Sequence, residues 1–186
     1  MKDILIYGGA FNPPTIAHQT VAQAAADYAE KHEMELWILP SGKRADKQID
    51  VDVDTRLSLV RALLASLTTS TTVRICDIEL KNDTLTQTID THRKLEKMYP
   101  QSRFMWLFGS DSVNTMHQWN EGDWLLSNLG MLIVQRPGFE IDIPLGDNAH
   151  FLDVEQIDIS STEVRERRFA GLPIEHLVPP LVLPFV

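Results

Sequence analysis

Short apolar runs that alternate with longer amphipathic segments are the feature that most constrains the fold of this chain. The runs cover residues 4–7, 36–39, 73–76, 104–108 and 131–134. Most of them are separated by segments whose apolar residues recur at spacings of three and four, which predicts helices. The helical candidates cover residues 16–32, 54–67, 86–98 and 161–169. This order predicts an α/β protein with a doubly wound, mostly parallel, Rossmann-like sheet.

The length and organisation of the chain predict one domain. Its 186 residues, 44% of them hydrophobic, are enough to bury one sizeable core. The chain has no internal repeat, no low-complexity segment and no linker rich in proline, glycine or serine. We therefore expect a single domain over residues 1–186, with an irregular excursion over 137–150.

Composition and charge narrow the class of partner. A single cysteine, Cys76, cannot form an intramolecular disulfide and suits a reducing cytoplasm. No apolar stretch approaches a membrane span, and the first apolar run is too short for a secretory signal. A net charge of -9 argues against nucleic-acid binding, which depends on many contacts from Lys and Arg to phosphates. We expect a cytoplasmic protein without nucleic-acid or membrane partners, for which a homo-oligomer is possible.

Glycine-containing turns follow the predicted strands. They cover residues 8–13, 40–43, 109–111 and 135–138. In an open parallel sheet ligands bind at the carboxyl ends of the strands, where glycines permit close approach and helix starts present free N–H groups to anions. Each turn alone reads as an ordinary loop, but their joint occurrence favours a site for a phosphate-bearing ligand.

Signatures of three common enzyme classes are absent. Gly8-Gly9 lacks the third glycine of a dehydrogenase fingerprint, and Gly42-Lys43 is not followed by the Ser or Thr of a Walker A loop. No two of the six histidines have the helical spacing of a zinc site. The sequence therefore disfavours oxidoreductases, P-loop kinases and zincins, and predicts no metal held by protein side chains alone.

Two motifs far apart in the chain point to one family. The first is Gly8-Gly9-Ala10-Phe11-Asn12-Pro13-Pro14-Thr15-Ile16-Ala17-His18, and the second is Ile159-Ser160-Ser161-Thr162-Glu163-Val164-Arg165. They resemble the patterns G-G-x-F-x-P-x-[HT]-x-G-H and I-S-[SA]-T-x-x-R of the nucleotidyltransferase superfamily typified by bacterial nicotinate-nucleotide adenylyltransferases. Further similar residues are Gly109-x-Asp111, Trp119, Arg136-Pro137-Gly138 and Leu177-Val178-Pro179.

The chain departs from the family pattern at three places. Thr15 stands where many members have a histidine, and Ala17 replaces the usual glycine. Thr84-Leu85 stands in place of an aromatic-threonine pair before the third helix. This last departure leaves the identity of the acceptor undetermined, and it does not concern the nucleotide donor.

The resemblance implies a role for each group of matching residues. The expected catalytic residues are His18, Thr15 and Arg165. The expected nucleotide-binding residues are Gly8, Gly9, Ala10, Phe11, Ala17, Gly109, Asp111, Ser160, Ser161 and Thr162. The expected acceptor-binding residues are Lys43, Thr84, Leu85, Trp119 and Arg136. Such groups suit phosphoryl-type transfer, in which positioning and charge stabilisation dominate.

Each assignment has a structural alternative. His18 near a helix start can donate to an α-phosphate oxygen, or can simply support the helix. Ser160 and Glu163 also fit a capping box, which leaves Arg165 unexplained. Lys43 begins a basic stretch with Arg44 and Lys47 that can be a lid over phosphates or a solvated charge run.

Two further residues carry alternatives of the same kind. Trp119 fits either a core or a stacking platform for an acceptor base. Asp111 fits either a ribose ligand or a helix cap.

The resemblance implies transfer of AMP from ATP to nicotinate mononucleotide, with Mg²⁺ carried by ATP. Alternatives are the same chemistry on nicotinamide mononucleotide, phosphopantetheine or another phosphorylated acceptor, and a non-catalytic nucleotide sensor. Thr84 and Gln87 also fit a capping box that would start a helix beside the acceptor and favour its carboxylate.

Overall fold

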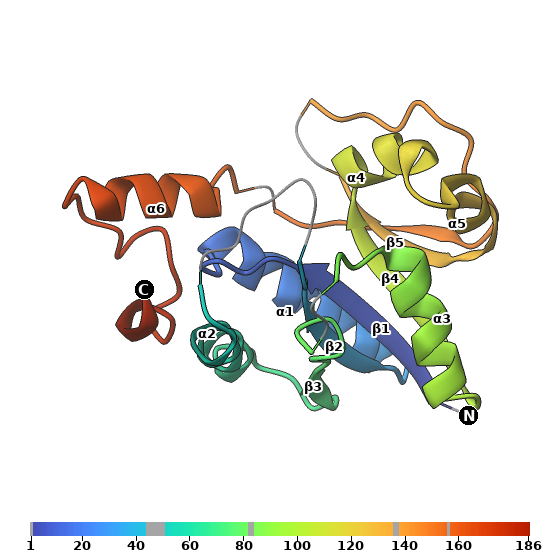
Figure 1. Cartoon of the computed structure of the whole chain (residues 1–186), viewed down its shortest axis with the longest axis horizontal. Helices are drawn as coiled ribbons and strands as arrows, with labels where there is room; N and C mark the ends of the chain where they lie inside the picture. The colour runs from blue at the N-terminus through green and yellow to red at the C-terminus, as the bar shows by residue number, and fades with distance from the viewer. Residues whose placement is uncertain (1, 44–50, 82–83, 136–137, 156) are drawn as a thin grey trace.

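The computed structural model describes residues 2–43, 51–81, 84–135, 138–155 and 157–186. It contains a six-stranded sheet in the order β3-β2-β1-β4-β5-β6, and all neighbouring strands are parallel (Figure 1). The strands are β1 (Lys2–Gly9), β2 (Glu35–Pro40), β3 (Val73–Ile75), β4 (Ser102–Gly109), β5 (Gly130–Val134) and β6 (Ala149–Leu152). The expected doubly wound parallel fold is confirmed.

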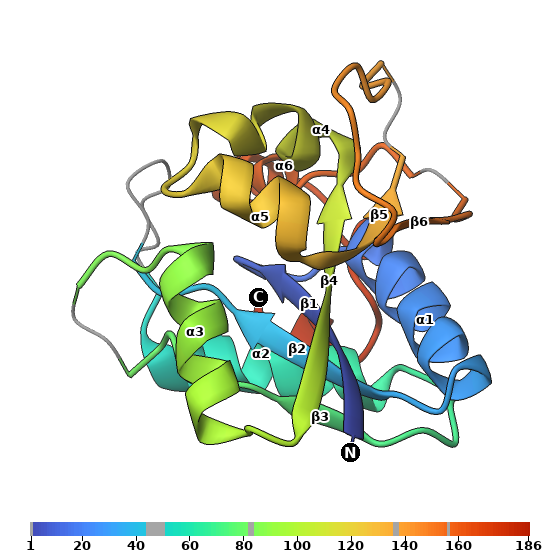
Figure 2. The same cartoon turned by 90° about the vertical axis from the view of Figure 1, so that its right-hand side faces the viewer.

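Helices cover both faces of the sheet. They are α1 (Ile16–Lys31), α2 (Val53–Ala65), α3 (Thr88–Met98), α4 (Ser110–Thr115), α5 (Gly122–Asn128) and α6 (Ser161–Phe169), with 3₁₀ turns η1 (Met116–Gln118) and η2 (Leu183–Phe185). Figure 2 shows α3 and α5 facing the viewer, whereas α6 and the C-terminus lie behind the sheet. Within the described ranges, no helix is both long and apolar enough to cross a membrane.

Alternate residues of each central strand enter two separate cores. Leu5 and Tyr7 of β1 face α1, α2 and the C-terminal segment, while Ile4 and Ile6 face α3, α4 and α5. A strand buried on both faces has no polar side, which is why the apolar runs are continuous rather than alternating. Four alanines line the sheet side of α1 and let this helix approach closely: Ala22, Ala25, Ala26 and Ala29.

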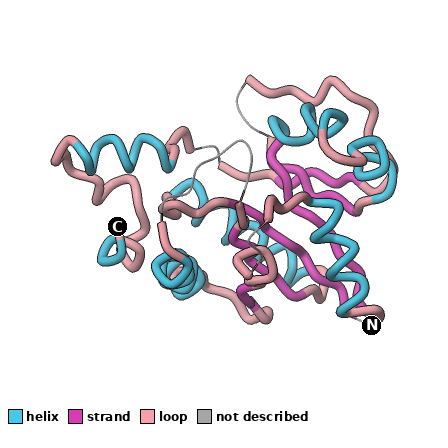
Figure 3. The backbone as a smooth tube through the Cα atoms, in the orientation of Figure 1, coloured by secondary structure: helices cyan, strands magenta, loops and turns pink. Residues whose placement is uncertain are grey.

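Three elements of the structure could not be predicted from the sequence pattern. α4 and α5 have six and seven residues, too few to establish a helical period. β6 is an edge strand of four residues, none of them buried, and so it lacks an apolar run. The path between β5 and β6 is largely loop (Figure 3), and Ile141 and Ile143 pack against the core beneath it.

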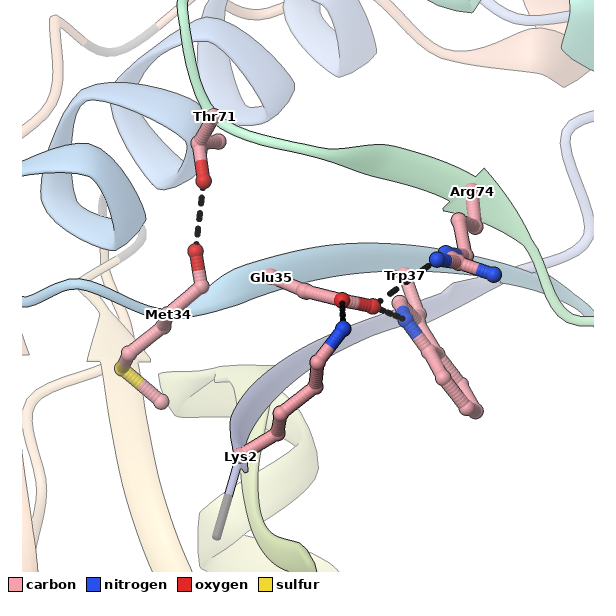
Figure 4. A network of polar contacts seen from close by, with 6 residues as sticks. All are labelled: Lys2, Met34, Glu35, Trp37, Thr71 and Arg74. Atoms are coloured by element: carbon pink, nitrogen blue, oxygen red, sulfur yellow. Dashed lines mark hydrogen bonds and ion pairs between the residues drawn. The ribbon is translucent and has the colours of Figure 1, made fainter.

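A polar network joins the first three strands at their amino ends, away from the predicted site (Figure 4). The buried carboxylate of Glu35 in β2 pairs with Lys2 of β1. It also accepts a hydrogen bond of 3.0 Å from Trp37 Nε1 and lies 3.2 Å from Arg74 Nε of β3. The network therefore ties neighbouring strands together, and we assign it to stability.

Glu35→Gln is expected to lower the free energy of unfolding by about 1–2 kcal/mol at pH 7. Burial raises the pKa of Glu35, but hydrogen bonds from Lys2 and Trp37 and the charge of Arg74 outweigh burial, so the pKa lies below its ordinary value. A lowered folded-state pKa adds stability above the ordinary value, and that stability is lost as pH falls through the folded value. Denaturant unfolding at pH 7 and pH 3 should therefore show a smaller difference between variant and wild type at pH 3.

The exposed Glu175 provides the control, because Glu175→Gln should change stability at neither pH. If Glu35→Gln lowered the free energy of unfolding equally at both pH values, the charge of Glu35 would not be the source of the stability.

Candidate active site

The candidate site lies where the order of the strands reverses. The chain proceeds from β1 through β2 to β3 on one side and from β4 through β5 to β6 on the other, so β1 and β4 are neighbours. In open α/β sheets the crevice at this switch point, outside the carboxyl ends of the strands, is the usual ligand site. Gly8 and Gly9 end β1 and Gly109 ends β4, so these predicted nucleotide-binding residues lie at the switch point.

The two glycines of β1 serve different purposes. A Cβ on Gly9 would lie 2.9 Å from Cζ of Phe11, so the ring of Phe11 requires glycine there. A Cβ on Gly8 would lie 4.0 Å from the nearest heavy atom, the carbonyl oxygen of Leu39. Gly8 is exposed although its strand is central. The protein itself therefore does not require glycine at position 8, which leaves room for a ligand.

Thr15 and His18 form a capping box at the start of α1. Thr15 is the buried N-cap, and its Oγ1 accepts from the His18 backbone N–H at 3.4 Å. The Thr15 backbone N–H donates to His18 Nδ1 at 3.2 Å, and Thr15 Oγ1 lies 2.8 Å from the same nitrogen. A backbone N–H can only donate, so Nδ1 is an acceptor and the neutral ring carries its proton on Nε2.

This arrangement places the two side chains differently. The neutral ring of His18 has its N–H donor at Nε2. Thr15 is fully buried and contacts the ring of His18 through its hydroxyl. The threonine in place of the family's histidine thus has a local explanation, because threonine is a good N-cap.

Phe11 supports the histidine from the other side. Its backbone adopts φ 46°, and its side chain is fully buried. The ring makes edge contacts with Tyr7 and His18, with centroid distances of 5.3 and 5.4 Å. Phe11 therefore shapes the loop and packs against His18, and its side chain is not at the surface where a nucleotide would bind.

The second motif docks onto the first across most of the chain. Ser161 Oγ donates to the carbonyl oxygen of Pro13 at 2.8 Å, from 148 positions away. Arg165 Nη1 donates to the carbonyl oxygen of Asn12 at 2.6 Å, and Nη2 donates to Thr162 Oγ1 at 3.0 Å. These contacts use two of the five guanidinium donors. Residues predicted from separate motifs are therefore brought into one constellation.

Ser160 has the capping role that was its structural alternative. It is the N-cap of α6, and its side chain accepts from the backbone N–H of Glu163 at 3.1 Å. The cap aims the start of α6, and with it Ser161 and Arg165, at the loop after β1. The cap explains Ser160, and Ser161 and Arg165 contact the loop after β1.

The predicted acceptor residues lie on neighbouring segments. Lys43 and Leu85 pair in an isolated parallel bridge, and the Thr86 backbone N–H donates to the Lys43 carbonyl oxygen at 3.0 Å. Thr84 is exposed beside them, and Leu85 is 58% exposed. An apolar side chain left open next to a lysine is a suitable surface for a charged, ring-bearing ligand.

The expected capping box of Thr84 and Gln87 is wrong. Gln87, not Thr84, is the N-cap, and α3 begins at Thr88 without a side-chain hydrogen bond at its cap. The backbone before α3 instead pairs with Lys43, and tertiary pairing of this kind overrides the local signal.

Trp119 and Asp111 flank the switch point on the β4 side. Gly109 is the N-cap of α4 and Asp111 lies in the first turn, so Asp111 is not the cap. The half-buried Trp119 follows η1 and meets Phe108 of β4 edge-on, with ring centroids 6.0 Å apart. Arg136, Arg44 and Lys47 lie outside the described residues. The predicted lid formed by the basic stretch therefore stays a prediction.

Besides Glu35, two further buried charges could not be recognised from the sequence motifs. Arg56 of α2 is 4% exposed and Glu79 is 7% exposed. Their signals were present: Arg56 occupies the apolar face of a helix, three residues before Leu59, and Glu79 stands between Ile78 and Leu80. Among the described residues, no three His, Cys, Asp or Glu side chains gather where they could hold a metal ion.

Comparison with known families defines the class. The model of the cytidylyltransferase-like family matches residues 6–167, a span that includes both motifs. The chain therefore belongs to the cytidylyltransferase-like family and is an enzyme of the nucleotidyltransferase class.

Individual relatives indicate which branch of this family the chain belongs to. The probable nicotinate-nucleotide adenylyltransferase of Halalkalibacterium halodurans is 34% identical over 181 residues, which cover 96% of this chain and 86% of the relative. The nicotinate-nucleotide adenylyltransferase of Bacillus subtilis is 28% identical over 186 residues, which cover 100% of this chain and 96% of the relative. The chain is thus a member of the nicotinate-nucleotide adenylyltransferase family.

A solved structure supports the fold. The nicotinic acid mononucleotide adenylyltransferase of Plasmodium falciparum, complexed with NaAD, superposes with a TM-score of 0.83 at 23% identity. The match covers 100% of this chain and 94% of the other.

Proposed function

We propose that this chain transfers the adenylyl group of ATP to nicotinate mononucleotide, which forms the dinucleotide precursor of NAD and releases pyrophosphate. The observation that carries the proposal is the docking of Ser161 and Arg165 on the loop that leads to His18. The docking lies at the sheet's switch point in a chain of the adenylyltransferase family. We treat residues 1–186 as one domain, and Cys76 as compatible with the cytoplasm.

The reaction needs donors rather than a nucleophile from the protein. A phosphate oxygen of the acceptor attacks the α-phosphorus of ATP, the bond from that phosphorus to the bridging oxygen breaks, and pyrophosphate leaves. His18 Nε2–H donates to an α-phosphate oxygen as negative charge grows there. The start of α1, which is the positive end of the helix dipole, adds positive potential at the same place.

The second motif supports the triphosphate. Arg165 has guanidinium donors beyond those used by Asn12 and Thr162, and a planar fork suits the β- and γ-phosphates. Ser161 and Thr162 hold hydroxyls at the start of α6, where a helix end favours anions. Mg²⁺ is carried by ATP, since phosphate oxygens and waters are the ligands it prefers.

We assign the remaining residues by their place around the crevice. Gly8 and Gly109 allow the adenosine moiety to approach β1 and β4, and Asp111 accepts a ribose hydroxyl. Lys43, Leu85 and Trp119 contact the acceptor, with the indole stacked on its pyridine ring. The start of α3, which no side chain caps, favours the carboxylate of nicotinate over an amide.

Gly8→Ala is expected to raise the KM for ATP roughly tenfold or more and to leave Tm within about 2 °C of the wild type, because the new methyl makes only an ordinary contact of 4.0 Å with the Leu39 carbonyl oxygen. Gly9→Ala is the matched comparison, because its methyl collides with Phe11. It should lower the free energy of unfolding by about 1–3 kcal/mol. Thermal unfolding and steady-state kinetics measure both effects. Normal ATP binding by Gly8→Ala would show that the open space over β1 is not the nucleotide site.

Pyrophosphate release over a panel of triphosphates and acceptors tests the proposed function. We expect turnover with ATP and nicotinate mononucleotide, at a kcat/KM about tenfold above that with nicotinamide mononucleotide. Phosphopantetheine should not react. Equal values for the two mononucleotides would contradict the assigned carboxylate preference. Binding of ATP without turnover on any acceptor would favour a nucleotide sensor instead.

A further inference from the structure

Helix α2 places a buried cation beneath the loop that follows β1. Arg56 is 4% exposed and donates from Nη2 to the carbonyl oxygen of Ala10 at 3.1 Å. In the part of the chain that the structure describes, Nε of Arg56 finds no hydrogen-bond partner. Arg56 lies on the same buried helix face as Leu59, Val60 and Leu63. A guanidinium in such a place needs a compensating charge.

Arg56 and Glu79 are linked through the backbone of two neighbouring segments. Arg56 holds the carbonyl oxygen of Ala10, and Glu79 holds the backbone N–H of Gly42. Between them, the Ser41 backbone N–H donates to the carbonyl oxygen of Gly9 at 2.8 Å. The charge interaction supports this link, because burial lowers the pKa of the Arg56 guanidinium and the charge of Glu79 raises it.

The Glu79 carboxylate also joins three segments on the acceptor side. Oε2 accepts from the Gly42 backbone N–H at 2.9 Å and from Thr86 Oγ1 at 3.1 Å, and Oε1 accepts from Thr91 Oγ1 at 2.8 Å. A Cβ on Gly42 would lie 2.6 Å from the Glu79 carbonyl oxygen, so the turn after β2 is held against this residue. Glu79 therefore sets the position of the segments that carry Lys43 and Leu85.

We propose that Arg56 and Glu79 are a pair of positioning residues that couples the binding of ATP to the binding of the acceptor. Arg56 holds the donor side through Ala10, next to Phe11 and His18, and Glu79 holds the acceptor side through Gly42 and Thr86. The inference rests on the proposed function for the assignment of these two sides to the two substrates.

The pair makes a specific energetic expectation. Removing either side chain loosens the junction at which the segments after β1 and β2 meet, which disturbs both sides. Once this junction is loosened, the second substitution adds little, so the two losses should not multiply. A residue that acts only on global stability would lower Tm but would not change the affinities for the two substrates in this non-multiplicative way.

The experiment is a double-substitution cycle of wild type, Arg56→Met, Glu79→Gln and the combined variant. Calorimetry measures the affinity for a non-hydrolysable ATP analogue with and without nicotinate mononucleotide, and kinetics measure KM for each substrate. Arg56→Met should weaken ATP-analogue binding about tenfold and acceptor binding about threefold, and Glu79→Gln should do the reverse. The combined variant should lose about as much ATP-analogue affinity as Arg56→Met alone, roughly threefold less than the product of the single losses.

Two more variants keep the test decisive. Arg61→Met, an exposed arginine on the same helix, should change neither affinity. Arg56→Lys keeps the buried positive charge but loses the planar fork. It should retain acceptor affinity and lose severalfold in ATP-analogue affinity, even where Arg56→Met does not fold.

Losses that multiply in the combined variant, or a fall in Tm with both affinities intact, would overturn the proposal. The ATP-analogue cycle needs no turnover. A wild type that binds the analogue but fails to adenylylate nicotinate mononucleotide would therefore count against the proposed function. The double-substitution cycle would still test whether Arg56 and Glu79 act together.

Discussion

His18→Ala is expected to lower kcat by roughly two orders of magnitude, about 3 kcal/mol, and to change ATP affinity by less than about threefold. The capping box assigns the proton of the neutral ring to Nε2, since Nδ1 accepts from the Thr15 backbone N–H. A donor aimed at the α-phosphate contributes most where charge develops in the transition state. Single-turnover kinetics and calorimetric ATP binding separate the two quantities.

The exposed His150 on β6 is the control, and His150→Ala should leave both quantities unchanged. Equal losses of kcat and ATP affinity in His18→Ala would show that the histidine binds the ground state and has no special role in the transition state.

Arg165→Ala is expected to weaken ATP binding and to lower kcat, each about tenfold or more, because the β- and γ-phosphates are charged before and during the reaction. The substitution also removes the 2.6 Å hydrogen bond to the carbonyl oxygen of Asn12, which loosens α6 from the loop before α1. Arg165→Lys should not restore either quantity, because an ammonium lacks the planar fork.

The same helix supplies a matched control for Arg165. Arg168 is exposed near the end of α6, and Arg168→Ala should behave as wild type. ATP affinity that is unchanged in Arg165→Ala would remove this residue from the triphosphate site.

The central strands of the sheet could be predicted from the sequence. The apolar runs of β1, β2, β4 and β5 are visible because these strands are buried on both faces. The edge strand β6 has no such burial, and α4 and α5 are too short to repeat a helical period. Burial on both faces makes the centre of a parallel sheet predictable. Of the two edge strands, β3 lies within an apolar run over residues 73–76 and could be predicted, whereas β6 could not.

The residue types of the site were predictable, but their contacts were not. Both motifs could be identified, yet nothing in their spacing indicates that Ser161 donates to Pro13 or that Arg165 donates to Asn12. Arg56 and Glu79 act through tertiary contacts between loops, which a local pattern does not encode. Pairing with Lys43 likewise displaced the helix start expected at Thr84.

Transfer of a labelled α-phosphate tests adenylyl transfer most directly. With ATP labelled at the α-phosphate and nicotinate mononucleotide as acceptor, the label should appear in the dinucleotide, and an equal amount of unlabelled pyrophosphate should form. Label in free AMP would indicate hydrolysis, and transfer of the γ-phosphate to the acceptor would indicate a kinase. Either result would contradict the proposed reaction.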